Sequence, residues 1–436
     1  MSMVFNRYAA FLLGLAVLAG FSPKAMASGS GAFRVELPDA GALGKGTAFV
    51  GEANTPAAVY YNPAGLNQLK GSEVSVGASF LAPQVDYKPF AGNEVQMRRN
   101  KFLIPHFYAA VPVMADKLTV GLGATSYFGL GTEWAQDSPL RYATTEAVIE
   151  NKDYMLTAAY QATEQWSFAV SADNDDSKAS KSKKLLQGGT GEDGDFQLKV
   201  KDNAWGYRLA TMYKLNDRHQ FGLMYRSRIG HIYEGKAYLD HLNNNNGSVP
   251  YQAIFGGTSY ETRLTEKFTL PQSVVMGYSF KPAGKWTFNA DVEWMDWSSV
   301  KHEAINWVDE TNTTRLSVLN GGNPAPRDWK SVWSEAIGAE YAATDHLRLR
   351  GGYYHHNTPI PQANWEPNLP DSDSHGLTAG FGYDVSKNLT VDMAYSALIF
   401  EARTIDNTVG DAFGSNVDGT YKQVIHMALM TFTYKF

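Results

Sequence analysis

The sequence predicts an all-β fold, a 14-stranded antiparallel transmembrane β-barrel with an N-terminal hatch, or plug, inside its lumen. Beyond residue 72, apolar and polar residues alternate with a period of two, as in strands that have one apolar and one polar face. The connections between these strands alternate between short polar turns and long loops, an asymmetry typical of transmembrane barrels. The chain of 436 residues has no cysteine, so an exported form needs a large core or a closed hydrogen-bond network in place of disulfides.

Residues 1–27 are expected to form a signal peptide. Arg7 precedes an apolar run at 8–21, and Ala25-Met26-Ala27 has the small-x-small pattern that a signal peptidase cuts. That run is too short to cross a bilayer as a helix, and no later stretch reaches even half of the ~20 apolar residues that a spanning helix needs. We therefore expect an exported chain that begins near Ser28 and lies in the cell outer membrane as a multi-pass protein.

Residues 28–71 are expected to form the hatch. The segment is rich in Gly and Ala, alternates weakly, and contains the turn-forming Asn62-Pro63 within AAVYYNPAGLNQL (57–69). A barrel of about fourteen strands encloses a lumen wide enough to need filling or to conduct water. A segment of this length before the first strand has the right size to plug it.

Residues 72–436 are expected to form the barrel. In the first strand Val74, Val76 and Phe80 share one face, and the last strand ends on an aromatic residue, Phe436. A β protein in lipid must close its sheet, because every backbone N–H and C=O needs a partner there. Long loops are expected, among others, at 175–196 and 239–257. The fourteen strands are expected at 73–80, 102–113, 117–130, 145–160, 165–173, 197–213, 220–233, 267–280, 285–298, 330–342, 346–356, 376–384, 388–400 and 424–436.

The composition argues against several classes of function. A net charge of −6 provides no basic surface for nucleic acid. His355 and His356 are adjacent in a strand and point to opposite faces, so a shared metal ion is not expected. No Ser-His-Asp grouping stands out, and the G-x-S-x-G motif is absent. We expect a protein that is not an enzyme and that has no cofactor, metal or nucleic acid partner.

Two segments resemble a known family, GALGKGTAFVGEANTPAAVYYNPAGL (41–66) and VGLGATSYFGLGTEW (120–134). They are similar to the FadL outer-membrane transporters of long-chain fatty acids and their relatives for aromatic hydrocarbons. The resemblance covers the whole mature chain. Further support comes from LRYA (140–143), DVEWMDWSSV (291–300), LRLRGGYYHHNTPIP (347–361) and Phe436.

The resemblance implies passive uptake of hydrophobic molecules, most of all long-chain fatty acids. Extracellular loops would capture the ligand, an apolar lumen site near the hatch would bind it, and it would leave sideways where the third strand kinks inward. The alternatives are uptake of aromatic hydrocarbons or alkanes, a lipid-hydrolysing enzyme of the outer membrane, and a water-filled porin. The implied partners are the hydrophobic ligand, outer-membrane lipids and the barrel assembly machinery, which would act through Phe436, and the chain is expected to be a monomer.

The resemblance also implies a lateral gate between the hatch and the third strand. Asn62, Pro63 and Ala64 would contribute from the hatch, and Ser126 and Gly129 would form the kink. A glycine lets a strand leave its ladder without a side-chain clash, and an Asn side chain can replace the lost bonds because it both donates and accepts. Two alternatives remain open. Gly129 can simply end the strand while Asn62 caps a turn, and the kink can lie at another nearby glycine, Gly121, Gly123 or Gly131.

Three residues are expected to bind ligand. Phe33 matches the apolar residue that the family's hatch offers to its ligand. Alternation places Arg348 and Arg350 on the lumen side of their strand, because a cation on the lipid face costs ~2 to 4 kcal/mol at mid-depth. There they can bind a carboxylate head group. The alternative is a structural role in which they pair with lumen acids such as Asp291 or Glu293.

Overall fold

The computed structural model describes residues 31–35, 38–187, 192–244, 249–411 and 414–436. The predicted signal peptide, 1–27, lies outside these residues, as do residues 28–30 at the start of the predicted hatch. No helix in the part that the structure describes is long and apolar enough to cross a bilayer.

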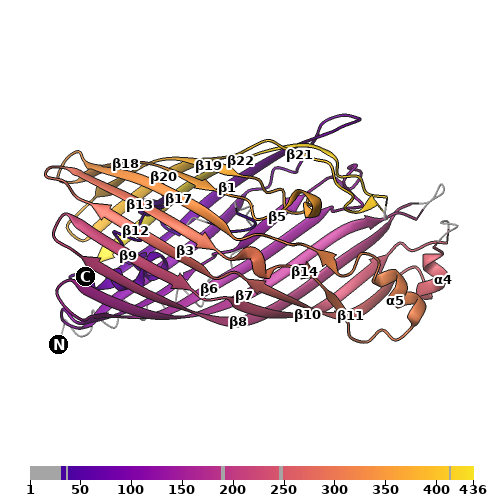
Figure 1. Ribbon diagram of the computed structural model, residues 1–436, viewed down its shortest axis with the longest axis horizontal. Helices are drawn as coiled ribbons and strands as arrows, with labels where there is room; N and C mark the ends of the chain where they lie inside the picture. The colour runs from indigo at the N-terminus through magenta and orange to yellow at the C-terminus, as the bar shows by residue number, and fades with distance from the viewer. Residues whose placement is uncertain (1–30, 36–37, 188–191, 245–248, 412–413) are drawn as a thin grey trace.

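The chain forms a closed antiparallel barrel of 14 strands, which confirms the predicted barrel (Figure 1). The first strand pairs with the second from Glu73↔Ala110 and with the last from Glu73↔Lys435, so the wall closes on itself. Three strands are interrupted and consist of two segments each. The wall contains β1 (Glu73–Pro89), β3 (Phe102–Met114), β4 (Leu118–Thr125) with β5 (Gly129–Glu133), β6 (Glu146–Gln161), β7 (Trp166–Leu185), β8 (Gly194–Lys214), β9 (His219–Arg226) with β10 (Ile229–Asp240), β11 (Tyr260–Leu270) with β12 (Ser273–Phe280), β13 (Trp286–Met295), β17 (Val332–Ala342), β18 (Leu347–His356), β19 (Ser374–Asp384), β20 (Leu389–Phe400) and β22 (Gly419–Lys435).

The connections differ at the two ends of the barrel, as the sequence predicted. Short turns join strands at one end, at the left of Figure 1, and the long connections gather at the other, where α4 and α5 lie. In barrels of this kind the long loops face the outside of the cell. The connections and loops contain β2 (Val95–Gln96), α4 (Tyr251–Phe255), η2 (Trp297–Ser299), β14 (His302–Glu303), β15 (Ile305–Trp307), α5 (Thr313–Leu319), β16 (Ala325–Pro326), η3 (Gln362–Asn364) and β21 (Arg403–Ile405).

One predicted loop is mostly strand. The stretch 175–196 was expected to be a loop because it is polar, but β7 continues to Leu185 and β8 begins at Gly194. Inward-facing Asp175 and Ser177 still alternate with outward residues there, and Lys178 pairs with Lys201 in register. Both faces of this stretch are polar, so the alternation of apolar and polar residues that identifies a membrane-spanning strand is absent.

The described residues before the first strand form three short helices, α2 (Ala40–Leu43), α3 (Ala58–Tyr61) and η1 (Pro63–Gln68). Their side chains are almost all buried. Their backbone is hydrogen-bonded to inward-facing side chains around the barrel, for example from Ala40 N to Thr431 Oγ1 at 3.0 Å and from Phe49 N to Asp291 Oδ2 at 2.8 Å. On the opposite wall, Arg208 donates to the Tyr60 carbonyl at 3.0 Å. We call residues 31–72 the N-terminal segment.

Glycines in the wall make room for this segment. A Cβ on Gly338 would lie 2.1 Å from the carbonyl oxygen of Lys45, and one on Gly352 would lie 2.2 Å from the nitrogen of Gly46. Gly222 and Gly277 face the backbone of residues 50 and 51 at similar distances. Only glycine permits such close backbone approach, so these four strand positions determine where the segment packs.

Candidate functional site

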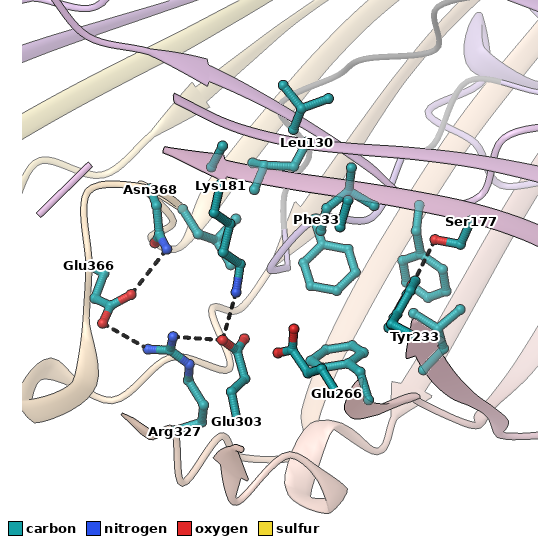
Figure 2. A pocket seen from close by; sticks show the side chains of 18 of the residues that line it. Phe33, Leu130, Ser177, Lys181, Tyr233, Glu266, Glu303, Arg327, Glu366 and Asn368 are labelled. Atoms are coloured by element: carbon teal, nitrogen blue, oxygen red, sulfur yellow. Dashed lines mark hydrogen bonds and ion pairs between the residues drawn. The ribbon is translucent and has the colours of Figure 1, made fainter. Parts of the chain in front are cut away.

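A largely apolar cavity lies in the half of the barrel that bears the long connections (Figure 2). Its apolar wall comes from β5, β6 and β11, from the loops 297–331 and 357–373, and from Phe33 of the N-terminal segment. Phe33 is 3% exposed and lines the cavity with Leu130, and its ring centroid lies 5.8 Å from that of Phe268. Ligand sites are typically concave and apolar with a few placed polar groups, and this cavity has both features.

One end of the cavity carries a cluster of charges. Lys181 donates to Glu303 at 2.7 Å, and Arg327 bonds both Glu303 at 2.9 Å and Glu366 at 3.1 Å. Burial alone would raise the pKa of Glu303, but the two cations hold it well below its usual range. A third carboxylate, Glu266 of β11, points into the same space (Figure 2).

The third strand is broken at residues 126–128, between β4 and β5. The first residues of the N-terminal segment occupy the break. Val35 N donates to the Tyr127 carbonyl at 2.8 Å, Gly129 N donates to the Phe33 carbonyl at 2.8 Å, and Arg34 forms a β-bridge with Phe128. The N-terminal segment thus satisfies backbone groups that the strand itself leaves unpaired, as a buried backbone requires.

The wall ladder is incomplete beside this break. β3 pairs with β4 from Phe107 to Met114, whereas β5 pairs with β6 alone. Residues 102–106 of β3 pair only with β1 on their other side. Among the described residues, β5 is connected to the chain that precedes β3 by Arg98 and Asn100. Both are hydrogen-bonded to Glu133, near the loop end of the barrel.

The backbone that meets at the break also separates two cavities. Phe33 and Phe128 line the outer cavity, whereas their neighbours Arg34 and Tyr127 line a second, inner cavity. The inner cavity is more polar. Arg226 pairs with Asp153 at 2.6 Å, and Arg34 pairs with Glu293.

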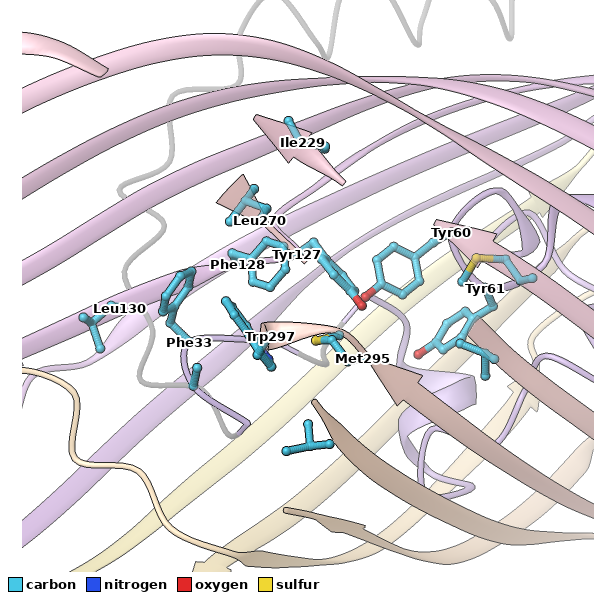
Figure 3. Packing of buried hydrophobic residues seen from close by; sticks show 14 of the residues in the cluster. Phe33, Tyr60, Tyr61, Tyr127, Phe128, Leu130, Ile229, Leu270, Met295 and Trp297 are labelled. Atoms are coloured by element: carbon cyan, nitrogen blue, oxygen red, sulfur yellow. The ribbon is translucent and has the colours of Figure 1, made fainter. Parts of the chain in front are cut away.

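Buried aromatic rings connect the two cavities (Figure 3). Ring centroids are 5.5 Å apart between Phe33 and Phe128, 4.6 Å between Phe128 and Tyr127, and 5.6 Å between Tyr127 and Tyr60. Trp297 packs edge-on against Phe33 at 5.2 Å. The rings form a continuous apolar surface from the outer cavity to the interior of the N-terminal segment.

Comparison with known proteins identifies the family. The model of the family described as outer membrane protein transport protein (OMPP1/FadL/TodX) matches residues 23–436. The chain belongs to this family. The protein is therefore an outer-membrane β-barrel of the FadL/TodX family, as the sequence resemblance predicted.

Two relatives and two solved structures illustrate the similarity. A protein of Neisseria meningitidis serogroup B named as an outer membrane protein is 25% identical over 426 residues, covering 88% of this chain and 90% of its own. The long-chain fatty acid transport protein of Escherichia coli K12 is 22% identical over 399 residues, covering 83% and 86%. A FadL homologue from Pseudomonas aeruginosa superimposes with a TM-score of 0.80 at 18% identity, covering 93% of this chain and 100% of its own. The toluene transporter TodX of Pseudomonas putida gives 0.70 at 19% identity, covering 94% and 99%.

In this member of the FadL/TodX family, Asn62 lies away from the strand break. Its amide donates to the carbonyls of Val50 at 2.9 Å and of Thr211, on β8, at 3.2 Å. Its side-chain oxygen accepts from Ala64 N at 3.2 Å and caps the η1 helix that Pro63 begins. The groups that replace the lost ladder bonds are therefore the backbone of 33–35, because a backbone strand matches the spacing of the broken ladder better than one amide does.

The two strand residues predicted for the gate do lie at the break. Ser126 Oγ donates to the Asn151 carbonyl at 2.6 Å, and Gly129 begins β5. Of the three other candidate glycines, Gly131 lies within β5, whereas Gly121 and Gly123 lie in regular β4. A Cβ on Gly121 would lie 2.7 Å from the side chains of Val59 and Leu66, and Gly123 also faces Val59. They make room for the N-terminal segment.

Arg348 and Arg350 face the barrel interior as predicted, and Leu349 between them is exposed on the outside. Arg348 forms two bonds with Asp384, at 2.6 and 2.9 Å. Arg350 pairs with Glu340 at 2.6 Å and with Asp392 at 2.5 Å. These pairs agree with the structural alternative, although the partners are not Asp291 or Glu293. Asp291 binds the backbone of residues 49 and 50, and Glu293 binds Arg34.

The charged end of the outer cavity was not predicted from the sequence. Lys181 lies in a polar stretch that was assigned to a loop, and Glu303 and Arg327 lie in a long connection without periodicity. Glu266 had a detectable signal. It alternates with Leu264, Phe268 and Leu270 on one face, where a lone carboxylate among apolar residues is unusual.

Proposed function

We propose that the protein takes up hydrophobic molecules across the outer membrane without an energy source. The ligand enters among the long loops, binds in the outer cavity against Phe33, and leaves sideways through the wall beside the break in the third strand. The N-terminal segment, 28–71 in the predicted limits, acts as the hatch. The observation that carries the proposal is that residues 33–35 both separate the two cavities and pair with the break.

The lateral path is supported by the missing ladder between β5 and residues 102–106. Movement of 33–35 away from Tyr127 and Gly129 would open the partition and free the strand break at the same time. A ligand can drive this movement only if it binds the open state more tightly than the closed state. The reason is that a ligand shifts a conformational equilibrium only by the difference between its affinities for the two states. Contact between the ligand and Phe33 supplies the coupling.

Long-chain fatty acids are the proposed substrates. The cavity combines an apolar body with one polar end, the arrangement that an amphiphile with a long tail requires. The similar protein of Escherichia coli K12 is named for fatty acid transport. Arg348 and Arg350 have no part in this proposal, since their guanidinium groups already pair with acids.

Aromatic hydrocarbons are the second candidate. The cavity wall includes the rings of Phe33, Phe128, Phe268 and Trp329, which can stack on an aromatic ligand. A hydrocarbon needs no polar partner. The proposal includes no catalytic step for either class of ligand.

Uptake of labelled oleate and labelled toluene by a strain that lacks its own transporter tests the proposal. Expression of this protein is expected to increase uptake of at least one of the two. Equal uptake with and without the protein would reject the proposed function. Ion conductance in planar bilayers distinguishes the proposed transporter from a water-filled porin, because a porin is expected to form an open, conducting channel.

We further propose that the protein acts as a monomer and that Phe436 is recognised by the barrel assembly machinery. The last strand closes the wall against the first, and the side chain of Phe436 is 44% exposed. Loss of assembly in a variant without Phe436 is the expected result.

A further inference from the structure

Glu266 is the one carboxylate of the outer cavity without a recorded ion pair or hydrogen bond among the residues that the structure describes. It is 7% exposed. Alternation along β11 places it between Leu264 and Phe268 on the inward face, where the charge cluster meets the apolar wall. Lys181 and Arg327 attract it at longer range, but none of the described residues lies within hydrogen-bond distance of its carboxylate. A buried carboxylate that lacks a hydrogen bond is costly, so a donor that bonds Glu266 gains more there than in water.

The rest of the cluster is already paired. The described residues that line the outer cavity include two cations, Lys181 and Arg327, and three carboxylates. Both cations bond Glu303, and Arg327 also bonds Glu366. A ligand carboxylate would therefore have to displace a glutamate from its cation and lie close to the negative charge of Glu266, in a cluster where three carboxylates already share two cations.

We propose that Glu266 determines which head group the cavity accepts, and that it selects a molecule whose polar end donates a hydrogen bond. An ionised carboxylate accepts bonds but donates none, so its natural partner is a hydroxyl, a protonated amine or a protonated carboxylic acid. The inference rests on the proposed function and narrows its ligand to an apolar body with a donor at one end. A fatty acid fits this site in its protonated form.

Three ligands with the same tail test the inference, octan-1-ol, octylammonium and octanoate. At pH about 8 the amine is protonated and the acid is ionised, so the head groups differ in charge and in donor capacity. Binding to the purified full-length protein in a neutral detergent is measured by tryptophan fluorescence, since Trp329 lines the cavity. We expect octan-1-ol and octylammonium to bind at least about tenfold more tightly than octanoate, a difference of about 1.4 kcal/mol.

The variant Glu266→Gln keeps the size of the side chain and adds a donor. It is expected to reduce the preference for octylammonium over octanoate to within about threefold. Glu234→Gln is the matched control, because it removes the same charge from an exposed position on the outer wall of the neighbouring β10. This control is expected to retain the wild-type preference. Glu266→Met, which also removes the charge, serves as a second variant if the glutamine variant does not fold, and it is expected to reduce the preference in the same way.

Two results overturn the inference while leaving the proposed function intact. One is tightest binding of octanoate by the wild-type protein, and the other is an unchanged preference in Glu266→Gln. Failure of all three ligands to bind would overturn the proposed function and this inference together.

Discussion

The carbonyl of Phe33 accepts a 2.8 Å hydrogen bond from the backbone N–H of Gly129. One residue belongs to the N-terminal segment and the other begins the outer half of the interrupted third strand. The Phe33 side chain lines the outer cavity. The same residue thus contacts both the cavity in which we propose that a ligand binds and the strand break through which we propose that it leaves.

Truncation of Phe33 is expected to weaken ligand binding. Phe33→Ala removes a ring that packs against Phe128 and Trp297 and leaves the backbone bond to Gly129 in place. A loss of about tenfold in affinity for oleate is expected, because a buried aromatic contact contributes about 1.4 kcal/mol or more. Fluorescence titration measures it. Phe90→Ala, at a position 63% exposed, is the control and is expected to bind normally.

A β-branched residue at Gly129 is expected to reduce uptake. Gly129→Val introduces a branched side chain where the strand restarts and where Phe33 approaches, so the pairing that we propose to control the lateral path is disturbed. Labelled oleate uptake is expected to fall by more than about half, and heat-modifiable migration is expected to remain, because the closed barrel does not depend on this position. Gly230→Val is the control, since an added Cβ there meets no atom within 4 Å. Normal uptake by Gly129→Val would contradict the proposed path.

Removal of the Asn62 amide is expected to loosen the hatch. Asn62→Ala leaves the buried carbonyl of Val50 without its bond to the amide, at a cost of about 1 to 3 kcal/mol for an unsatisfied buried group, and also removes the bond to the partly buried carbonyl of Thr211. Reduced uptake and faster proteolysis of the N-terminal segment are expected, with the barrel still folded. Proteolysis at the wild-type rate would show that these bonds do not hold the segment.

Glycines of the wall are expected to control the position of the hatch. Gly338→Ala places a Cβ 2.1 Å from the Lys45 carbonyl, closer than any real contact, so the segment must move. Faster hydrogen exchange is expected in residues 45–51. Gly351→Ala is the matched control on the adjacent strand, because its Cβ would meet only a carbonyl oxygen at 3.9 Å. Equal exchange in the two variants would contradict the prediction.

The attachment of the N-terminal segment to the loops is expected to depend on pH. Asp371 lies in the loop 357–373 and accepts bonds from Ala32 N at 2.9 Å and from Thr358 Oγ1 at 2.7 Å. Burial, together with the nearby charge of Asp373, raises the pKa of Asp371 to about 7, against the opposing effects of its hydrogen bonds and Arg403. A carboxyl with a raised folded pKa stabilises the fold below its unfolded pKa of 3.8, and this stabilisation is lost as the pH rises to about 7.

Asp371 is therefore expected to stabilise the wild-type protein less at pH about 8 than at pH about 4, which lowers the unfolding temperature at the higher pH by the contribution of this group. Asp371→Asn keeps the shape of the side chain and does not titrate, so the pH-dependent difference is expected to shrink. Thermal unfolding followed by circular dichroism at the two pH values measures it. An unchanged difference in the variant would exclude Asp371 as its source.

The sequence by itself determined the architecture. Alternation in segments such as 73–80 and 424–436 predicts strands, and a lipid-embedded sheet has no solution other than closure, so the barrel of 14 strands followed from local pattern and one physical constraint. The same pattern placed Arg348 and Arg350 inside. The alternation of apolar and polar residues does not continue beyond the membrane. There both faces of β7 are polar, so the sequence of the strand has the composition of a loop.

Only the tertiary structure decided which inward residues meet. Ala40 bonds Thr431 and Ala32 bonds Asp371, and nothing near either residue in the sequence predicts its partner. These contacts depend on the tilt and stagger of the closed wall, which set the height of every inward side chain and follow from the pairing of the whole sheet. For that reason the charged end of the cavity, with Glu266 in it, and the backbone of 33–35 in the strand break became visible only in the folded protein.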